Sequence, residues 1–135
     1  MDRGEPLDMA RLYEIEAANV ALVKGFLASW HRPLEIDFGF LAPGGLFRSN
    51  DWTPTPKDAA ELREYFKGVV TPEDRVEVVI HQIFAKGSLV AMARTDTVKA
   101  PGKPDRIYEI AAHFTVKHGK IAEWTDHVYS WRVAD

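Results

Sequence analysis

Three charged residues, Arg94, Asp96 and Asp126, stand in segments that otherwise have the composition of half-buried β-strands. Because side chains alternate between the two faces of a strand, Arg94 and Asp96 share a face with Met92, and Asp126 shares one with Trp124. Burying an unpaired carboxylate costs several kcal/mol. We therefore expect the three charges to pair with one another or to line a water-filled pocket.

An arginine between two carboxylates can satisfy both through its fork of N–H donors. Different surroundings could then keep one aspartate protonated as an acid and leave the other ionised as a base. A structural ion pair is the common role of an Arg–Asp pair at this spacing. Three charges on two strands, all in phase with apolar side chains, favour a functional site instead.

Composition limits the classes of protein to which the chain can belong. Its 135 residues, of which 46% are hydrophobic and 27% charged, predict one globular domain over residues 1–135. A net charge of -3 gives no basic surface, so we expect neither nucleic acid nor a membrane surface as a partner. No apolar run is long enough to span a membrane, and the lack of cysteine fits the reducing cytoplasm.

Hydrophobic periodicity predicts the elements that position these residues. A long amphipathic helix begins after Asp8 and ends before the residues HRP at 31–33. Residues 33–45 predict a short helix or an irregular turn, and residues 45–52 a short strand. Thr55 and Pro56 are typical of an N-cap followed by the first helical residue, and they predict a second helix that ends before Pro72.

After Pro72 the chain becomes rich in Val, Ile, Thr and aromatic residues, which predicts four strands. They cover residues 75–85, 88–99, 105–117 and 120–132. The last strand should turn Ala122 to the same face as Asp126. Turn-forming residues separate the runs and predict antiparallel hairpins. Helices first and a meander last indicate an α+β fold in which the sheet curls around the helices.

The sequence ARTDTV at 93–98, followed by GKPDRIYEIAAHFTVKHGKIAEWTDHVY at 102–129, resembles the carboxy-terminal half of the limonene-1,2-epoxide hydrolase family. The shared features are an Arg-x-Asp strand, a Gly-Lys-Ile turn and a Trp-x-Asp ending. Over essentially the whole chain, the order of elements is similar to the NTF2-like, or SnoaL-like, superfamily. That resemblance implies a cone in which N-terminal helices pack in a strongly curved, mixed but mainly antiparallel sheet.

The resemblance implies a catalytic role for each charged residue. Asp126 would be the base that takes a proton from water, Asp96 the acid that protonates the epoxide oxygen, and Arg94 the bridge between them. The implied reaction takes one step, without a covalent intermediate, a cofactor or a metal. It converts a small, largely apolar epoxide into a vicinal diol.

The family also uses a Tyr and an Asn on the first strand to hold the attacking water. Asn50 stands at the Asn position of this chain, while Arg48 or Phe47 stands where the Tyr would be. Arg48 near Asp126 would weaken that aspartate as a base, and it could select an anionic or polar substrate. We therefore assign Arg48 to substrate binding and Asn50 to catalysis.

Six apolar or aromatic residues are expected to form the wall of the cavity, although each could also be plain core. They are Phe26, Met92, Tyr108, Ile110, Phe114 and Trp124. No pair of histidines has metal-ligand spacing with a nearby carboxylate, so we expect no metal. Proteins similar to this family are commonly dimers, and the outer sheet face, which carries Thr95, Thr97, Thr115 and Thr125, is the expected homodimer interface.

Two other functions fit the same residues. The first is a lyase, isomerase or polyketide cyclase of the same fold, in which one aspartate moves a proton and Arg94 is only structural. The second is a non-catalytic protein whose cavity holds a small apolar ligand. Exchange of an α-proton on a cyclic ketone, without activity on epoxides, would favour the first. Unchanged ligand affinity in an Asp126→Asn variant would favour the second.

Overall fold

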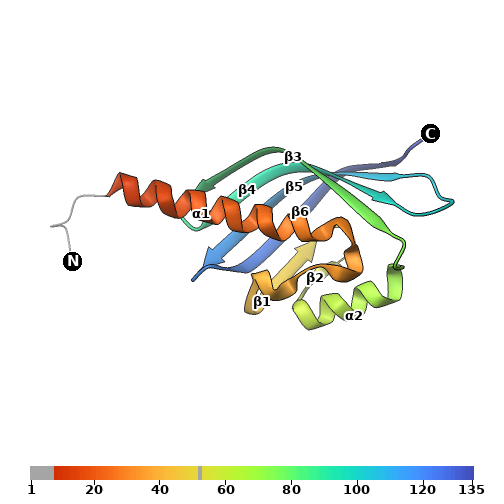
Figure 1. Ribbon diagram of the computed structural model, residues 1–135, viewed down its shortest axis with the longest axis horizontal. Coiled ribbons are helices and arrows are strands. Elements are labelled where there is room, and N and C mark those ends of the chain that lie inside the picture. The colour runs from red at the N-terminus through yellow and green to blue at the C-terminus, as the bar shows by residue number, and fades with distance from the viewer. Residues whose placement is uncertain (1–7, 52) are drawn as a thin grey trace.

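The computed structural model describes residues 8–51 and 53–135. Helix α1 covers Met9–Ala28 and helix α2 covers Ala59–Val69, with short 3-10 helices at Ser29–His31, Pro33–Glu35 and Phe38–Phe40 (Figure 1). The strands are β1 (Leu41–Ser49), β2 (Thr53–Lys57), β3 (Arg75–Lys86), β4 (Leu89–Lys99), β5 (Arg106–Lys117) and β6 (Lys120–Val133). None of the helices in these described ranges is long and apolar enough to cross a membrane.

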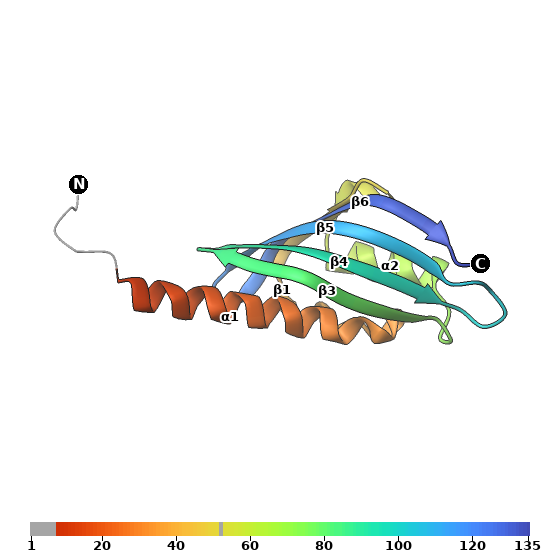
Figure 2. The ribbon, with the colours of Figure 1, turned by 90° about the horizontal axis from the view of Figure 1, so that it is seen from above.

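All six strands form one sheet in the order β2-β1-β6-β5-β4-β3. Strand β1 runs parallel to β6, with Ser49 opposite Asp126, and every other neighbouring pair is antiparallel. Helix α1 lies along one face of this curved sheet (Figures 1 and 2). Phe26 of α1 and Trp30 of the 3-10 helix that follows it pack into the core against Trp124. The predicted α+β, mainly antiparallel architecture is confirmed.

The prediction that α2 begins after Thr55 is wrong, because Thr55 and Pro56 belong to β2. The helix begins at Ala59 with Asp58 as its N-cap. The Asp58 side chain accepts from the Glu61 backbone N–H at 2.9 Å, and the Glu61 side chain accepts from the Asp58 N–H at 3.1 Å. This capping box satisfies two backbone donors that a cap at Thr55 would leave unpaired.

The segment at 33–45 is only partly as predicted. Its first part forms the 3-10 helices Pro33–Glu35 and Phe38–Phe40, but β1 already begins at Leu41. A second difference lies at the start of β6, where Ile121 is fully buried and Ala122 only half-buried. The β5–β6 register shifts between Thr115 and Val116, and this irregularity breaks the period-two alternation. Beyond it, Trp124 and Asp126 face the core side as predicted.

We predict that Asp58→Ala destabilises the protein by about 1 kcal/mol, because the variant loses the N-cap of α2. Thermal unfolding should show a melting temperature lower by a few °C, as expected for a domain of this size. The matched control is Thr55→Ala, whose exposed side chain lies in β2. Equal losses in the two variants would show that the capping box is not the stabilising feature.

Candidate active site

Arg94 is fully buried and contacts both aspartates through paired hydrogen bonds. Its Nε donates to Asp96 Oδ1 at 3.0 Å, and its Nη2 lies 3.3 Å from Asp96 Oδ2. On the other side, Nη1 donates to Asp126 Oδ1 at 3.0 Å and Nη2 donates to Asp126 Oδ2 at 2.6 Å. The structure therefore brings together the three charged residues singled out in the sequence, with one guanidinium shared between two carboxylates.

The sheet explains how one side chain can reach both carboxylates. Arg94 and Asp96 are on β4 and Asp126 is on β6, so β5 lies between them. Strands two apart are separated by roughly 10 Å, a gap that needs a long side chain. On β5 the residue opposite Asp126 is Ala112, which is also opposite Met92. Its single methyl group leaves room for the arginine to pass over the middle strand.

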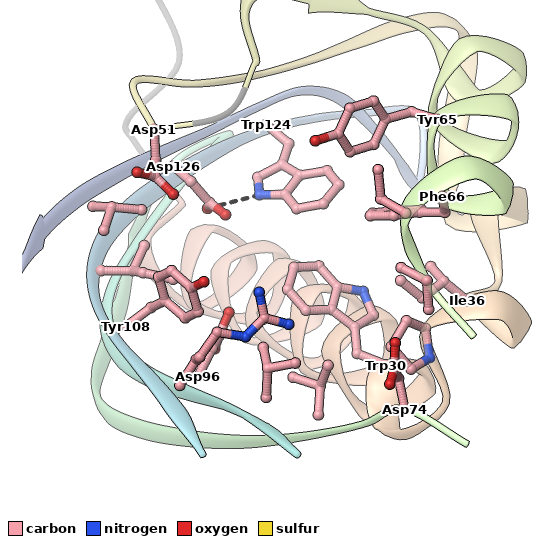
Figure 3. Close-up of a pocket in the computed structure, with 18 residues that line it drawn as sticks. Trp30, Ile36, Asp51, Tyr65, Phe66, Asp74, Asp96, Tyr108, Trp124 and Asp126 are labelled. Carbon is pink, nitrogen blue, oxygen red and sulfur yellow. Dashed lines mark hydrogen bonds between the residues drawn. The ribbon is translucent and has the colours of Figure 1, made fainter. Parts of the chain in front are cut away.

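Aromatic rings close the polar group on two sides. The Trp124 indole Nε1 donates to Asp126 Oδ1 at 2.8 Å, an interaction drawn in Figure 3. The Trp30 ring lies over the Arg94 guanidinium with a distance of 5.0 Å to the ring centroid, which is a cation–π contact. The charges are thus removed from water but paired, as buried charges must be.

A cavity of about 310 Å³ opens onto this group. Both Asp96 and Asp126 line it, whereas Arg94 lies behind them with no exposed surface. The opposite wall includes Tyr65 and Phe66 of α2 (Figure 3). A ligand in the cavity would therefore meet two carboxylates with aromatic rings around them.

The surroundings of the two aspartates differ. Burial raises the pKa of the Asp96 carboxyl, and the charge and hydrogen bonds of Arg94 offset this only in part. Burial alone would lower the pKa of Arg94, but the charges of Asp126 and Asp96 outweigh it and raise this pKa above its ordinary value. The guanidinium therefore stays charged, and the raised pKa of Asp96 favours the protonated form of this carboxyl.

Neither residue predicted at the first strand lines the cavity. Arg48 is exposed, while its neighbours Phe47 and Ser49 are buried. The Asn50 side chain is bound to the backbone of β6, where it donates to Val128 O at 2.9 Å and accepts from Val128 N at 2.7 Å. Because β1 pairs with β6, its alternation turns Phe47 and Ser49 inward and leaves Arg48 and Asn50 outside.

Three of the six predicted wall residues, Tyr108, Ile110 and Trp124, line the cavity. The other three, which are Phe26, Met92 and Phe114, lie in the core outside the cavity lining. Phe114 stacks on Trp124 and Phe26 meets its edge, with ring centroids 6.2 and 5.2 Å apart. Phe26 and Phe114 therefore hold Trp124 in position, and none of the three residues lines the cavity.

Several lining residues were not identified from the sequence. Trp30, Tyr65 and Phe66 come from helices whose packing on the sheet is a tertiary feature. Asp51 lies beside Asp126 in Figure 3, just beyond the end of β1. Arg106 could have been identified from the sequence, because it precedes Tyr108 by two residues and so shares its face of β5. Within residues 8–51 and 53–135, no group of His, Asp or Glu residues could hold a metal ion.

Comparison with known proteins gives a family and several structural neighbours. Residues 23–124 match the model of the SnoaL-like domain. An LEH-like epoxide hydrolase from M. tuberculosis has a TM-score of 0.67 and 22% identity, covering 84% of each chain. A putative SnoaL-like polyketide cyclase from Jannaschia sp. CCS1 has a TM-score of 0.65 and 18% identity, covering 93% of this chain and 92% of that chain.

A putative ketosteroid isomerase from Kribbella flavida DSM 17836 has a TM-score of 0.64 and 13% identity, covering 85% of this chain and 80% of the other. No curated protein matches the sequence. At these identities the structural neighbours establish the fold alone. The NTF2-like, SnoaL-like fold that the sequence predicted is thereby confirmed.

We predict that Asp96 makes stability fall with rising pH. Its pKa is higher in the folded protein than in an unfolded chain, so the folded state binds this proton more tightly. The free energy of unfolding should therefore decrease as pH rises from about 3.9, the ordinary aspartate pKa, through the raised pKa of Asp96. Urea unfolding over a pH series should show that Asp96→Asn loses this part of the slope.

The matched control is Glu123→Gln, which removes an exposed carboxylate from β6 and should keep the wild-type slope. Identical slopes in wild type and Asp96→Asn would contradict the prediction.

Proposed function

This chain belongs to the SnoaL-like domain family, and we propose that it is a cytoplasmic, cofactor-independent epoxide hydrolase. It would add water in one step to a small, largely apolar epoxide and release a vicinal diol. The observation that carries the proposal is the pair of carboxylates that line one cavity and share a single buried arginine. The M. tuberculosis neighbour, whose description names an LEH-like epoxide hydrolase, supports it.

In the proposed reaction, Asp126 accepts a proton from water as the water oxygen bonds to an epoxide carbon. The carbon–oxygen bond of the ring breaks at the same time, and Asp96 gives its proton to the departing oxygen. The raised pKa of Asp96 suits an acid that must begin protonated. Asp126 accepts hydrogen bonds from two Arg94 N–H groups and from the Trp124 indole, and an ionised carboxylate supplies these acceptors.

The bridging arginine suits this proton balance. One proton enters the group at Asp126 and one leaves at Asp96, so the total charge of the three side chains is the same before and after the step. The buried guanidinium therefore never faces an unbalanced change of charge. The cycle closes when the proton returns from Asp126 to Asp96 through solvent.

In this proposal the Asn50 side chain acts by binding the backbone of β6. Its side chain fastens the turn after β1 to Val128, two residues beyond Asp126. Ser49 is opposite Asp126 in the β1–β6 ladder, and Asp51 lines the cavity. We assign Asn50 a positioning role for the water site and not direct contact with the water.

A second candidate is an isomerase or a polyketide cyclase. The Kribbella neighbour, a putative ketosteroid isomerase, and the Jannaschia neighbour, a putative polyketide cyclase, support it. In that case a single aspartate would move a proton on a ketone. The ketone would occupy the same cavity, so the two candidates are distinguished by the reaction that is observed.

The test uses a panel of cyclic and aryl epoxides in ¹⁸O-water with wild type, Asp96→Asn and Asp126→Asn. Wild type should form diol that carries one solvent oxygen in a single turnover, which excludes a carboxylate oxygen from the protein. Each variant should lose at least about 10²-fold in rate, the usual contribution of a general acid or base. Glu123→Gln, on the exposed side of β6, should keep full activity.

No diol above the uncatalysed rate across the panel would contradict the hydrolase proposal. Exchange of an α-proton on a cyclic ketone would then favour the isomerase or cyclase. Binding of an apolar ligand with neither reaction, unchanged in Asp126→Asn, would favour a non-catalytic binding protein.

We also propose a homodimer through the outer face of the sheet. This face places Thr95 among the exposed apolar residues Val79 and Phe84, which are 53% and 62% exposed. Light scattering should give the mass of two chains, and Ala93→Glu should lower it by placing a charge in the middle of the interface. Lys103→Glu, in the β4–β5 turn, is the control and should leave the mass unchanged. A wild-type mass of one chain would exclude the dimer.

A further inference from the structure

The inner face of the sheet continues past the cavity at the end that carries the β4–β5 turn. There the strands extend beyond the ends of α1 and α2, so neither helix covers them (Figures 1 and 2). Trp131 stacks on Tyr108 with ring centroids 6.3 Å apart, and Tyr108 lines the cavity. Val133 follows on the same side, opposite Arg106 in the β5–β6 ladder.

We call Tyr108, Trp131 and Val133 the rim shelf. Trp131 is 56% exposed and Val133 is 47% exposed, which is unusual for large apolar side chains on the inner face of a sheet. The shelf is continuous with the cavity through Tyr108. An apolar surface that extends directly from a ligand cavity is suited to the part of a ligand that projects out of it.

Arg106 places a positive charge beside the rim shelf, opposite Val133 in the β5–β6 ladder. It lines the cavity, and its side chain is exposed. Among residues 8–51 and 53–135, no carboxylate lies within ion-pair distance of it. The neighbouring cation Lys99 is already paired, at 3.6 Å from Glu77 and 3.3 Å from Asp105.

The two other carboxylates that line the cavity do not neutralise this charge. Asp74 is 9% exposed, and its Oδ2 accepts from the Thr71 N–H at 3.0 Å. Asp51, just beyond the end of β1, also lines the cavity, and it is not within ion-pair distance of Arg106. Arg106 is therefore a cation that faces the ligand site and has no acidic partner in the described chain, so it can bind an anionic group of a ligand.

We propose that Arg106 and the rim shelf form a subsite for a carboxylate, so that the natural substrate is an epoxide joined to an acidic group by a short apolar chain. This inference rests on the proposed hydrolase function. Tyr108 is opposite Asp96 and Arg106 is two residues further along β5, so the Cα atoms of Tyr108 and Arg106 lie roughly 7 Å apart along the strand. The intervening chain lies against Tyr108 and Trp131.

The experiment compares terminal epoxides of alkenoic acids with their methyl esters. Wild type should show a KM about tenfold lower for the acid, the effect of one charge-assisted contact of about 1.4 kcal/mol. Arg106→Gln should remove this difference, and Arg106→Lys should restore part of it. The control is Arg132→Gln, an exposed arginine beside Trp131 that alternation places on the outer face.

A second measurement does not depend on hydrolysis. Isothermal titration of octanoate and of octanol should show tighter binding of octanoate, with the preference lost in Arg106→Gln. Trp131→Ala should weaken binding of both ligands because the rim shelf contacts the chain.

The outcomes separate the two proposals. Preference for octanoate without turnover of any epoxide would support the subsite and overturn the hydrolase function. Equal KM values for acid and ester, together with equal binding of octanoate and octanol in wild type, would overturn the subsite. If Trp131→Ala binds both ligands as tightly as wild type does, the rim shelf is not part of the subsite.

Discussion

The buried guanidinium of Arg94 between two carboxylates is the constraint on which the rest of the structure depends. Three buried charges are tolerated only when nearly all of their polar groups are paired. Here the Arg94 Nε, Nη1 and Nη2 groups all donate to carboxylate oxygens of Asp96 or Asp126. This pairing needs a small residue at Ala112, a donor at Trp124 and an aromatic cover at Trp30. Loss of the arginine would leave two carboxylates facing each other in an apolar core.

The sheet meets this constraint through its strand order and irregularities. The antiparallel meander places β4 and β6 on either side of β5, which fixes the separation that Arg94 spans. The parallel pairing of β1 with β6 sets Ser49 against Asp126 and brings Asp51 to the cavity. Register shifts in the β1–β2, β3–β4 and β5–β6 pairs add local twist, which helps the sheet to curve around the helices.

Part of the site could be predicted from the alternation of side chains between the two faces of each strand. Arg94, Asp96 and Asp126 were found because charges in phase with apolar side chains are visible without knowledge of the fold. Whether Asn50 faces inward depends on how β1 pairs with a strand about 75 residues later in the chain, and no local signal carries that register. The start of α2 was missed for a different reason, since a capping box competed with a Thr-Pro pair and satisfied more backbone donors.

The two aspartates are chemically unequal although one arginine joins them. Asp126 has an additional donor in Trp124, whereas burial favours the protonated form of Asp96. Isomerisation can use one carboxylate that removes a proton and returns it, so a second one is not required. Addition of water to an epoxide needs both at once, because a proton leaves the water as another reaches the ring oxygen. Two unequal carboxylates that open onto one cavity therefore meet both demands of hydration.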